Sequence, residues 1–221
     1  MPADRSRGKN VGRPPRLSVD AIIAAADRIL RAEGAEKLSM RRLAAELDST
    51  PMALYYHVRD KDELLLLVIE SHARRLPRPH FPEDPKERLL AAALTLYELL
   101  SERLWIVEVL TSDGLAAPSA MWMVEAMLQA SVDYGHTPDH SVYVYRTIWN
   151  YIVGNLMLRL NRERRRAHTD SPVHCDRIIA DLPPDTHPRL AAASPRWAEL
   201  TSRDTHREAL AAIVDALLPD R

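Results

Sequence analysis

The side chains best suited to contact a polyanion are concentrated in one short stretch, residues 38–61 (LSMRRLAAELDSTPMALYYHVRDK). Arginine and lysine neutralise phosphates, and hydroxyl and phenol groups donate hydrogen bonds to phosphate oxygens. A guanidinium can also form two hydrogen bonds with a guanine edge. The stretch therefore has the chemistry of a DNA-binding surface, and its candidate contact residues are Ser39, Arg41, Arg42, Thr50, Pro51, Met52, Ala53, Tyr55, Tyr56, His57 and Lys61.

Two short helices joined by a tight turn would present these side chains. The apolar residues at 40, 43, 44 and 47 repeat at helical spacing after Ser39, which is a favourable N-cap. The second helix would begin at Pro51, a residue that suits a first helical turn, and would extend to about His57. Asp48 lies in the turn, where an aspartate tolerates the left-handed conformation. We therefore predict a helix-turn-helix.

Two further helices flank this motif in the predicted organisation. Ser18 caps a first helix that Gly34 ends, and Asp60 with Glu63 forms a capping box for a fourth helix that reaches about Leu76. Prolines at 77, 79, 82 and 85 follow, so the domain boundary is placed there. The predicted parts are a disordered basic arm (1–17), a DNA-binding domain with its connecting helix (18–76) and a larger domain (80–221).

The charges follow the same division. Residues 1–61 carry 12 Lys/Arg and 8 Asp/Glu, a net charge of +4, whereas residues 62–221 carry 18 and 23, a net charge of −5. This asymmetry indicates that the front of the chain meets nucleic acid. Within the arm, Arg13 between Gly12 and Pro14 could enter a minor groove. The alternative is a solvated tail or a non-specific phosphate contact.

The first turn of the recognition helix would face the base edges, and its residues Pro51, Met52 and Ala53 are apolar. They would contact thymine methyl groups and sense DNA shape, which leaves Arg41 as the candidate for direct guanine readout. Packing in the core is the alternative for the aromatic residues, and it is the expected role of Leu54 and Val58. The predicted phosphate contacts are Tyr55, His57 and Lys61, with Tyr56 joining them or packing inward. Arg42 is expected to be a solvated or phosphate-facing charge.

The larger domain has the pattern of a helical bundle. Ala, Leu, Arg and Glu dominate the composition, Gly numbers only 6, and no alternating β-branched run occurs, so we predict an all-α fold. Residues 167–187 are rich in Pro, Asp and His and are predicted to be a long loop. Helical periodicity covers residues 85–101, 103–112, 118–134, 138–166, 188–201 and 204–218.

Aromatic and Met residues on these helices could line a cavity for a small apolar or amphipathic ligand, with plain core packing as the alternative. Asn150 is the most suggestive, because a buried amide needs a partner and a ligand could supply one. The candidate ligand-binding residues are Leu96, Trp105, Leu110, Met123, Met127, Tyr145, Trp149 and Asn150.

A homodimer on a palindromic operator is expected, because one short recognition helix reads few base pairs. Two apolar stripes could form the dimer interface. They consist of Ile152, Leu156 and Leu160 on one helix and Leu210, Ile213, Val214 and Leu217 on another.

No catalytic or cofactor site is expected. The sequence has no nucleophile–base motif, Gly-rich phosphate loop or pair of convergent carboxylates. The single cysteine fits a reducing cytoplasm, and the longest uncharged apolar run, residues 64–69, is too short to span a membrane. One cluster has side chains of the types that bind zinc, namely His168, Asp170, His174, Cys175 and Asp176. Its spacing matches no strong zinc motif.

Residues 18–70 resemble the DNA-binding domain of the TetR family of bacterial repressors. Residues 54–58 (LYYHV) and Lys61 match the family pattern of Leu-Tyr-x-His/Tyr-Val/Phe followed by a lysine before a Leu-rich helix. Asp48 replaces the glycine that is usual at the turn. The resemblance implies a phosphate contact for Tyr55.

The remainder is similar to the effector-binding domain of the tetracycline-repressor branch, mainly at residues 135–155 and 187–191. In that branch a histidine on the sixth helix and an acid on the eighth hold the metal of the drug. Leu110 and Leu158 occupy those places here, which argues against metal–tetracycline sensing.

The expected function is therefore a sequence-specific, DNA-binding transcriptional regulator, a repressor that a small molecule releases from its operator. Two alternatives stay open. The helical body could be a ligand-free protein-interaction module, or it could be a metal-dependent sensor or enzyme.

Overall fold

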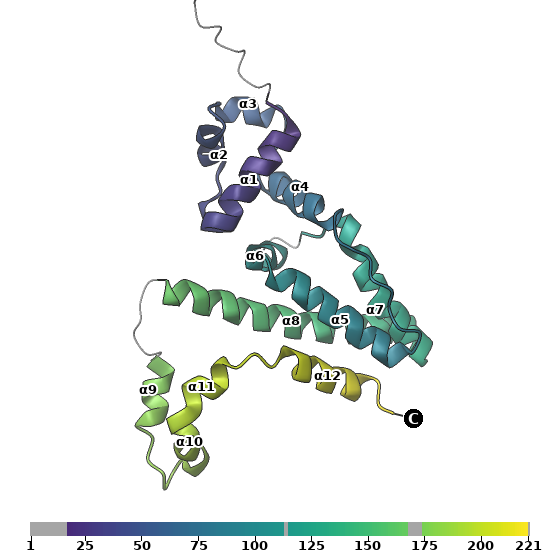
Figure 1. Cartoon of the computed structure of the whole chain (residues 1–221), viewed down its shortest axis with the longest axis vertical. Coiled ribbons are helices and arrows are strands. Elements are labelled where there is room, and N and C mark those ends of the chain that lie inside the picture. The colour runs from purple at the N-terminus through teal and green to yellow at the C-terminus, as the bar shows by residue number, and fades with distance from the viewer. Residues whose placement is uncertain (1–16, 113–114, 168–173, 221) are drawn as a thin grey trace, which may run out of the picture. The chain divides into compact units, whose positions relative to one another are not determined.

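The structure is a computed structural model, and it describes residues 17–112, 115–167 and 174–220. The basic arm falls outside the described residues except for Leu17, and so do His168 and Asp170 of the predicted loop. Within the described ranges the chain forms helices and no strand, which confirms the all-α prediction (Figure 1). The fold divides into two compact units between Ser71 and His72, a few residues before the proline-rich segment.

The first unit contains the four helices expected from the sequence. Its core includes Ile22, Leu30 and Leu43, together with Leu54, and all are essentially inaccessible to solvent. Val58 is also buried, so the predicted core roles of Leu54 and Val58 are confirmed. The elements of this unit are α1 (Val19–Glu33), the 3-10 turn η1 (Ala35–Lys37), α2 (Met40–Glu46), α3 (Pro51–Tyr55) and α4 (Lys61–Ala73).

Side-chain caps fix where the first three of these helices begin. The hydroxyl oxygens of Ser18, Ser39 and Thr50 each accept a hydrogen bond of 3.2 Å from the backbone N–H three residues later. The Glu63 N–H donates to Asp60 Oδ1 over 2.8 Å and caps α4 in the same way. These bonds satisfy N–H groups that would otherwise lack intrahelical partners, so the predicted helix starts are confirmed.

Asp48 makes the turn between α2 and α3. Its φ of 47° is the only positive value among the described non-glycine residues, and it lies in the left-handed region. The Ser49 N–H then donates to the Ala44 carbonyl over 2.9 Å and closes the end of α2. The aspartate therefore has the backbone conformation that the sequence predicts for it.

We expect Asp48→Val to lower the free energy of unfolding by roughly 1–2 kcal/mol, because a β-branched residue is strained in the left-handed region. Asp48→Gly should leave the free energy of unfolding unchanged or raise it slightly, since glycine adopts this conformation without strain. Urea denaturation of both variants measures the difference. Equal stability of the two variants would show that the turn conformation carries no strain.

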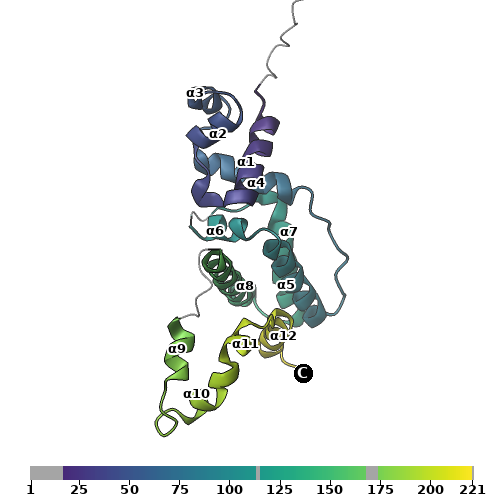
Figure 2. The same ribbon diagram turned by 60° about the vertical axis from the view of Figure 1, so that its left-hand side comes forward.

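The second unit is a bundle in which α5 packs against α7 and α12, and α8 packs against α6, α7 and α12 (Figures 1 and 2). The segment from α9 to α11 packs mainly on itself. Its elements are α5 (Pro85–Ser101), α6 (Leu104–Ser112), η2 (Pro118–Ala120), α7 (Met121–Tyr134), α8 (Pro138–Arg166), α9 (His174–Ala180), α10 (Pro188–Ala193), η3 (Ser194–Arg196), α11 (Trp197–Ser202) and α12 (His206–Leu217).

Two secondary-structure predictions in this unit are wrong. Residues 174–180, predicted to be loop, form α9, a helix too short to give a periodic signal and held by the buried side chain of Ile179. The helix predicted over 188–201 is interrupted by η3, where Pro195 lacks the N–H that a continuous helix needs.

Four of the seven residues in the apolar stripes predicted to form a dimer interface lie in the core instead, whereas Leu160, Ile213 and Leu217 are half-buried. Ile152, Leu156, Leu210 and Val214 are fully or almost fully buried within a single chain. They belong to the core between α8, α12 and their neighbours.

None of the described helices is long and apolar enough to cross a membrane.

Candidate DNA-binding surface and ligand site

The first turn of α3 forms an exposed apolar tip. Pro51 is exposed, the side chain of Met52 is 68% exposed, and Ala53 is half-buried. One turn further along, Leu54 anchors the helix in the core, and α3 packs against α2. The helix therefore presents its N-terminal side chains to solvent while its other face is fixed.

The two adjacent arginines of α2 differ in their surroundings. Arg42 donates to Glu33 on α1 over 2.8 Å and lies 3.9 Å from Glu46. The hydrogen bond to Glu33, with its charge, raises the pKa of Arg42. Arg41 is exposed, and within the described part of the chain it forms no hydrogen bond or ion pair. Arg41 is thus the arginine whose guanidinium is available to a ligand.

The aromatic end of α3 is exposed as well. Tyr55 and His57 are exposed, and Tyr56 is 85% exposed, so none of the three packs in the core of its unit. Of the two alternatives considered for Tyr56, inward packing is therefore wrong. The backbone of α3 places Tyr55, Tyr56 and Leu54 in three different directions, and only Leu54 faces inward.

Lys61 has an intramolecular partner that the sequence did not indicate. Its Nζ donates to the Ala35 carbonyl over 2.9 Å and connects the start of α4 to η1. Two N–H groups of the ammonium remain available for a phosphate. Nearby, Arg59 is 82% exposed in the turn before α4, 3.3 Å from Glu63. The sequence prediction missed Arg59, although its place between Val58 and Lys61 was a usable signal.

The eight candidate ligand-binding residues fall into three groups. Leu96, Met123 and Met127 are buried, as is Trp105, whereas Leu110, Tyr145 and Trp149 are half-buried. The rings of Tyr145 and Trp149 lie 6.4 Å apart on α8, and burial raises the pKa of the Tyr145 phenol. Asn150 is exposed on α8, so the prediction of a buried amide is wrong.

Trp105 on α6 has an unusual feature among these candidates. Its indole Nε1 is fully buried and has no hydrogen-bond acceptor among the described residues. A buried donor without an acceptor costs roughly 1–3 kcal/mol. The sequence placed Trp105 among the ligand candidates but gave no sign of this unsatisfied N–H group.

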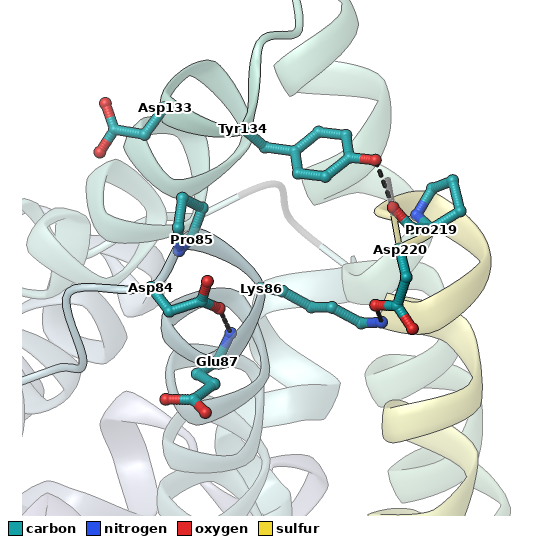
Figure 3. A pocket seen from close by; sticks show the side chains of 8 residues that line it. All are labelled: Asp84, Pro85, Lys86, Glu87, Asp133, Tyr134, Pro219 and Asp220. Carbon is teal, nitrogen blue, oxygen red and sulfur yellow. Dashed lines mark hydrogen bonds and ion pairs between the residues drawn. The ribbon is translucent and has the colours of Figure 1, made fainter.

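A pocket of about 490 Å³ lies where the end of α12 meets α5 and α7 (Figure 3). Lys86 on α5 lies 3.0 Å from Asp215 and 2.6 Å from Asp220, and these carboxylates raise its pKa. Tyr134 on α7 donates to the Pro219 carbonyl. These bonds join the end of α12 to two helices, so the pocket is a structural junction.

The exposed α3 tip, the capped turn and the helical bundle define a helix-turn-helix protein with a separate helical domain. The chain belongs to the TetR family. The family model for bacterial regulatory proteins of the tetR family matches residues 22–68, and the tetracyclin repressor-like C-terminal domain matches residues 78–217. Both matches confirm the resemblance noted in the sequence.

Individual relatives support this assignment. The HTH-type transcriptional repressor DrrR1 of Streptomyces coeruleorubidus is 35% identical over an alignment of 173 residues that covers 76% of this chain and 64% of that protein. ActR of Streptomyces coelicolor in complex with actinorhodin superposes with a TM-score of 0.72 at 25% identity, covering 92% of this chain and 97% of ActR. BioQ with its double-stranded DNA operator gives a TM-score of 0.59 at 29% identity, covering 68% and 92%.

Proposed function

We propose that this protein is a transcriptional repressor without enzymatic activity that binds operator DNA through α2 and α3. The proposal rests on two exposed features of one well-anchored motif, namely the α3 tip and the guanidinium of Arg41 on α2, which has no partner among the described residues. The apolar tip would contact thymine methyl groups, and Arg41 would donate to guanine O6 and N7. Tyr55, His57 and Arg59 would bind phosphates and set the register. The solved complex of BioQ with its double-stranded DNA operator supports operator binding by this fold.

We further propose a homodimer formed through the exposed face of α8. Tyr143 and Leu158, each 59% exposed, lie on this face with Asn150 and Gly154 between them. A Cβ added to Gly154 would meet no atom within 4 Å, so packing within the chain does not require glycine there. A glycine in the interior of a helix costs about 1 kcal/mol relative to alanine, but it allows a second helix to approach closely. A second copy of α8 would fill that space.

The larger unit is proposed to bind the effector near α6. The buried Nε1 of Trp105 supports this site, because an acceptor atom on a bound molecule would satisfy the N–H group. The complex of ActR with actinorhodin supports a small-molecule ligand for the fold. Binding would shift the protein towards a conformer with low operator affinity. The size of this shift is set by the difference between the effector's affinities for the two conformers.

Arg41→Gln tests the assignment of the reading surface. With an operator selected from a random duplex library, this variant should lose preference at one base pair in each half-site, by about 1–3 kcal/mol. Arg42→Gln is the matched control, because Arg42 is already paired with Glu33. It should weaken binding to all sequences alike. Fluorescence anisotropy against single-base-pair variants measures both. Unchanged base preference in Arg41→Gln would place the reading surface elsewhere.

A further inference from the structure

One face of α8 changes from apolar to cationic along its length. The residues on this face are three or four positions apart, so they form one continuous stripe. The first half of the stripe is fully buried in the core, and the second half lies beyond it. In chain order the stripe consists of Val144, Ile148, Ile152, Asn155, Arg159, Arg162 and Arg166.

The cationic half of the stripe lines a pocket. This pocket has a volume of about 240 Å³, and Tyr97 of α5 and Arg203 of the segment between α11 and α12 also line it. Arginines from two separate parts of the chain thus converge on one concave site. A solvated surface helix would instead direct its arginines away from the core-facing side.

Both carboxylates in this pocket already have partners. Glu163 lies 2.9 Å from Arg159, and Asp204 lies 2.6 Å from the Nδ1 of His206. The hydrogen bond from His206 lowers the pKa of Asp204, so this carboxyl group is an anion at neutral pH. The remaining three arginines form no ion pair or hydrogen bond with any other residue that the structure describes. They are Arg162, Arg166 and Arg203.

The inner wall of the pocket also presents a donor. The Tyr97 hydroxyl donates to Asn155 Oδ1 over 2.8 Å, which occupies the acceptor of the amide and leaves its NH₂ group. The Tyr97 ring stacks on His206 at a centroid distance of 4.0 Å, so the tyrosine is held in place. The site therefore combines an amide donor with three guanidinium groups that form no ion pair.

We propose that this pocket binds a small oxyanion, a carboxylate or phosphate group on a compact molecule, at a site separate from the effector site near Trp105. Arginine side chains bind both groups in a planar, bidentate geometry. The volume is below that of typical pockets for drug-sized ligands, so the ligand is small. Asn155 and Arg162 contact it from α8, and Arg203 closes on it from the other side.

The test is isothermal titration calorimetry of the full chain with inorganic phosphate and with malonate, at constant ionic strength set by chloride. The expected result is saturable binding of one anion per chain. The probe that binds with the higher affinity indicates whether the ligand carries a phosphate or a carboxylate group. Arg162→Gln and Arg203→Gln should each weaken binding at least tenfold. Circular dichroism of each variant confirms that it is folded.

Arg165→Gln is the matched control, because Arg165 is an exposed arginine on the same helix that does not line the pocket. Its affinity should equal that of the unmodified protein. Absence of saturable binding for both anions would overturn the proposal, and so would an equal loss of affinity in the Arg165 variant. Operator binding does not enter the measurement, so its outcome is independent of the repressor function.

Discussion

Met127→Ala is expected to lower the free energy of unfolding of the larger unit by about 2–5 kcal/mol. Met127 has no exposed surface and lies on α7, which packs against both α5 and α8. Removing its side chain leaves a cavity that the surrounding helices can fill only in part.

Met121→Ala is the matched control, because Met121 is the same residue type on the same helix and is 43% exposed. Its effect should stay within about 0.5 kcal/mol. Urea denaturation followed by circular dichroism measures both variants. Equally small changes in the free energy of unfolding for the two variants would mean that Met127 lines a cavity rather than packed core. Met127 would then again be a candidate effector contact.

Gly154→Leu is expected to separate the proposed dimer and to lower operator affinity by roughly 10²–10⁴-fold, because two linked reading heads bind far more tightly than one. A leucine at this position would occupy the space that a second α8 needs. Sedimentation velocity reports the oligomeric state, and anisotropy with the selected operator reports the affinity.

Two further variants make the Gly154 experiment decisive. Glu125→Leu places the same side chain on an exposed position of α7 and should leave dimer and affinity unchanged. If the exposed face of α8 meets only water, Gly154→Ala should stabilise the helix by up to about 1 kcal/mol. If a second α8 crosses at Gly154, the same substitution should weaken self-association. A Gly154→Leu protein that remains a dimer would move the interface to another surface.

Interactions between residues close in sequence are sufficient to predict most of the secondary structure of the first unit. Ser18, Ser39 and Thr50 are caps that act three residues along the chain, so their positions determine where the helices start. Asp48 stands where the family usually has a turn glycine, and aspartate tolerates the left-handed region, which agrees with its φ of 47°. Such features depend on neighbours in the sequence, which is why the sequence predicts them.

Features that depend on distant parts of the chain were not predictable. The bond from Lys61 to Ala35 joins residues 26 positions apart. The stripe that includes Ile152 is apolar at helical spacing, but spacing does not reveal which partner covers it. Helices of the same chain bury it, since α8 packs against α6, α7 and α12. Asn150 was assigned to the core from its apolar neighbours, although it lies on the exposed face of α8.

The exposed tip of α3 has a consequence for how such proteins diversify. Met52 and Tyr56 contribute little to packing, whereas Leu54 and the Thr50 cap hold the helix in place. Substitutions at exposed positions usually change stability by no more than about 0.5 kcal/mol. After a gene duplication, one copy could therefore change its exposed tip at Pro51 and Met52, and with it the proposed operator preference, while its fold persists. Stability and target choice can evolve independently in this motif.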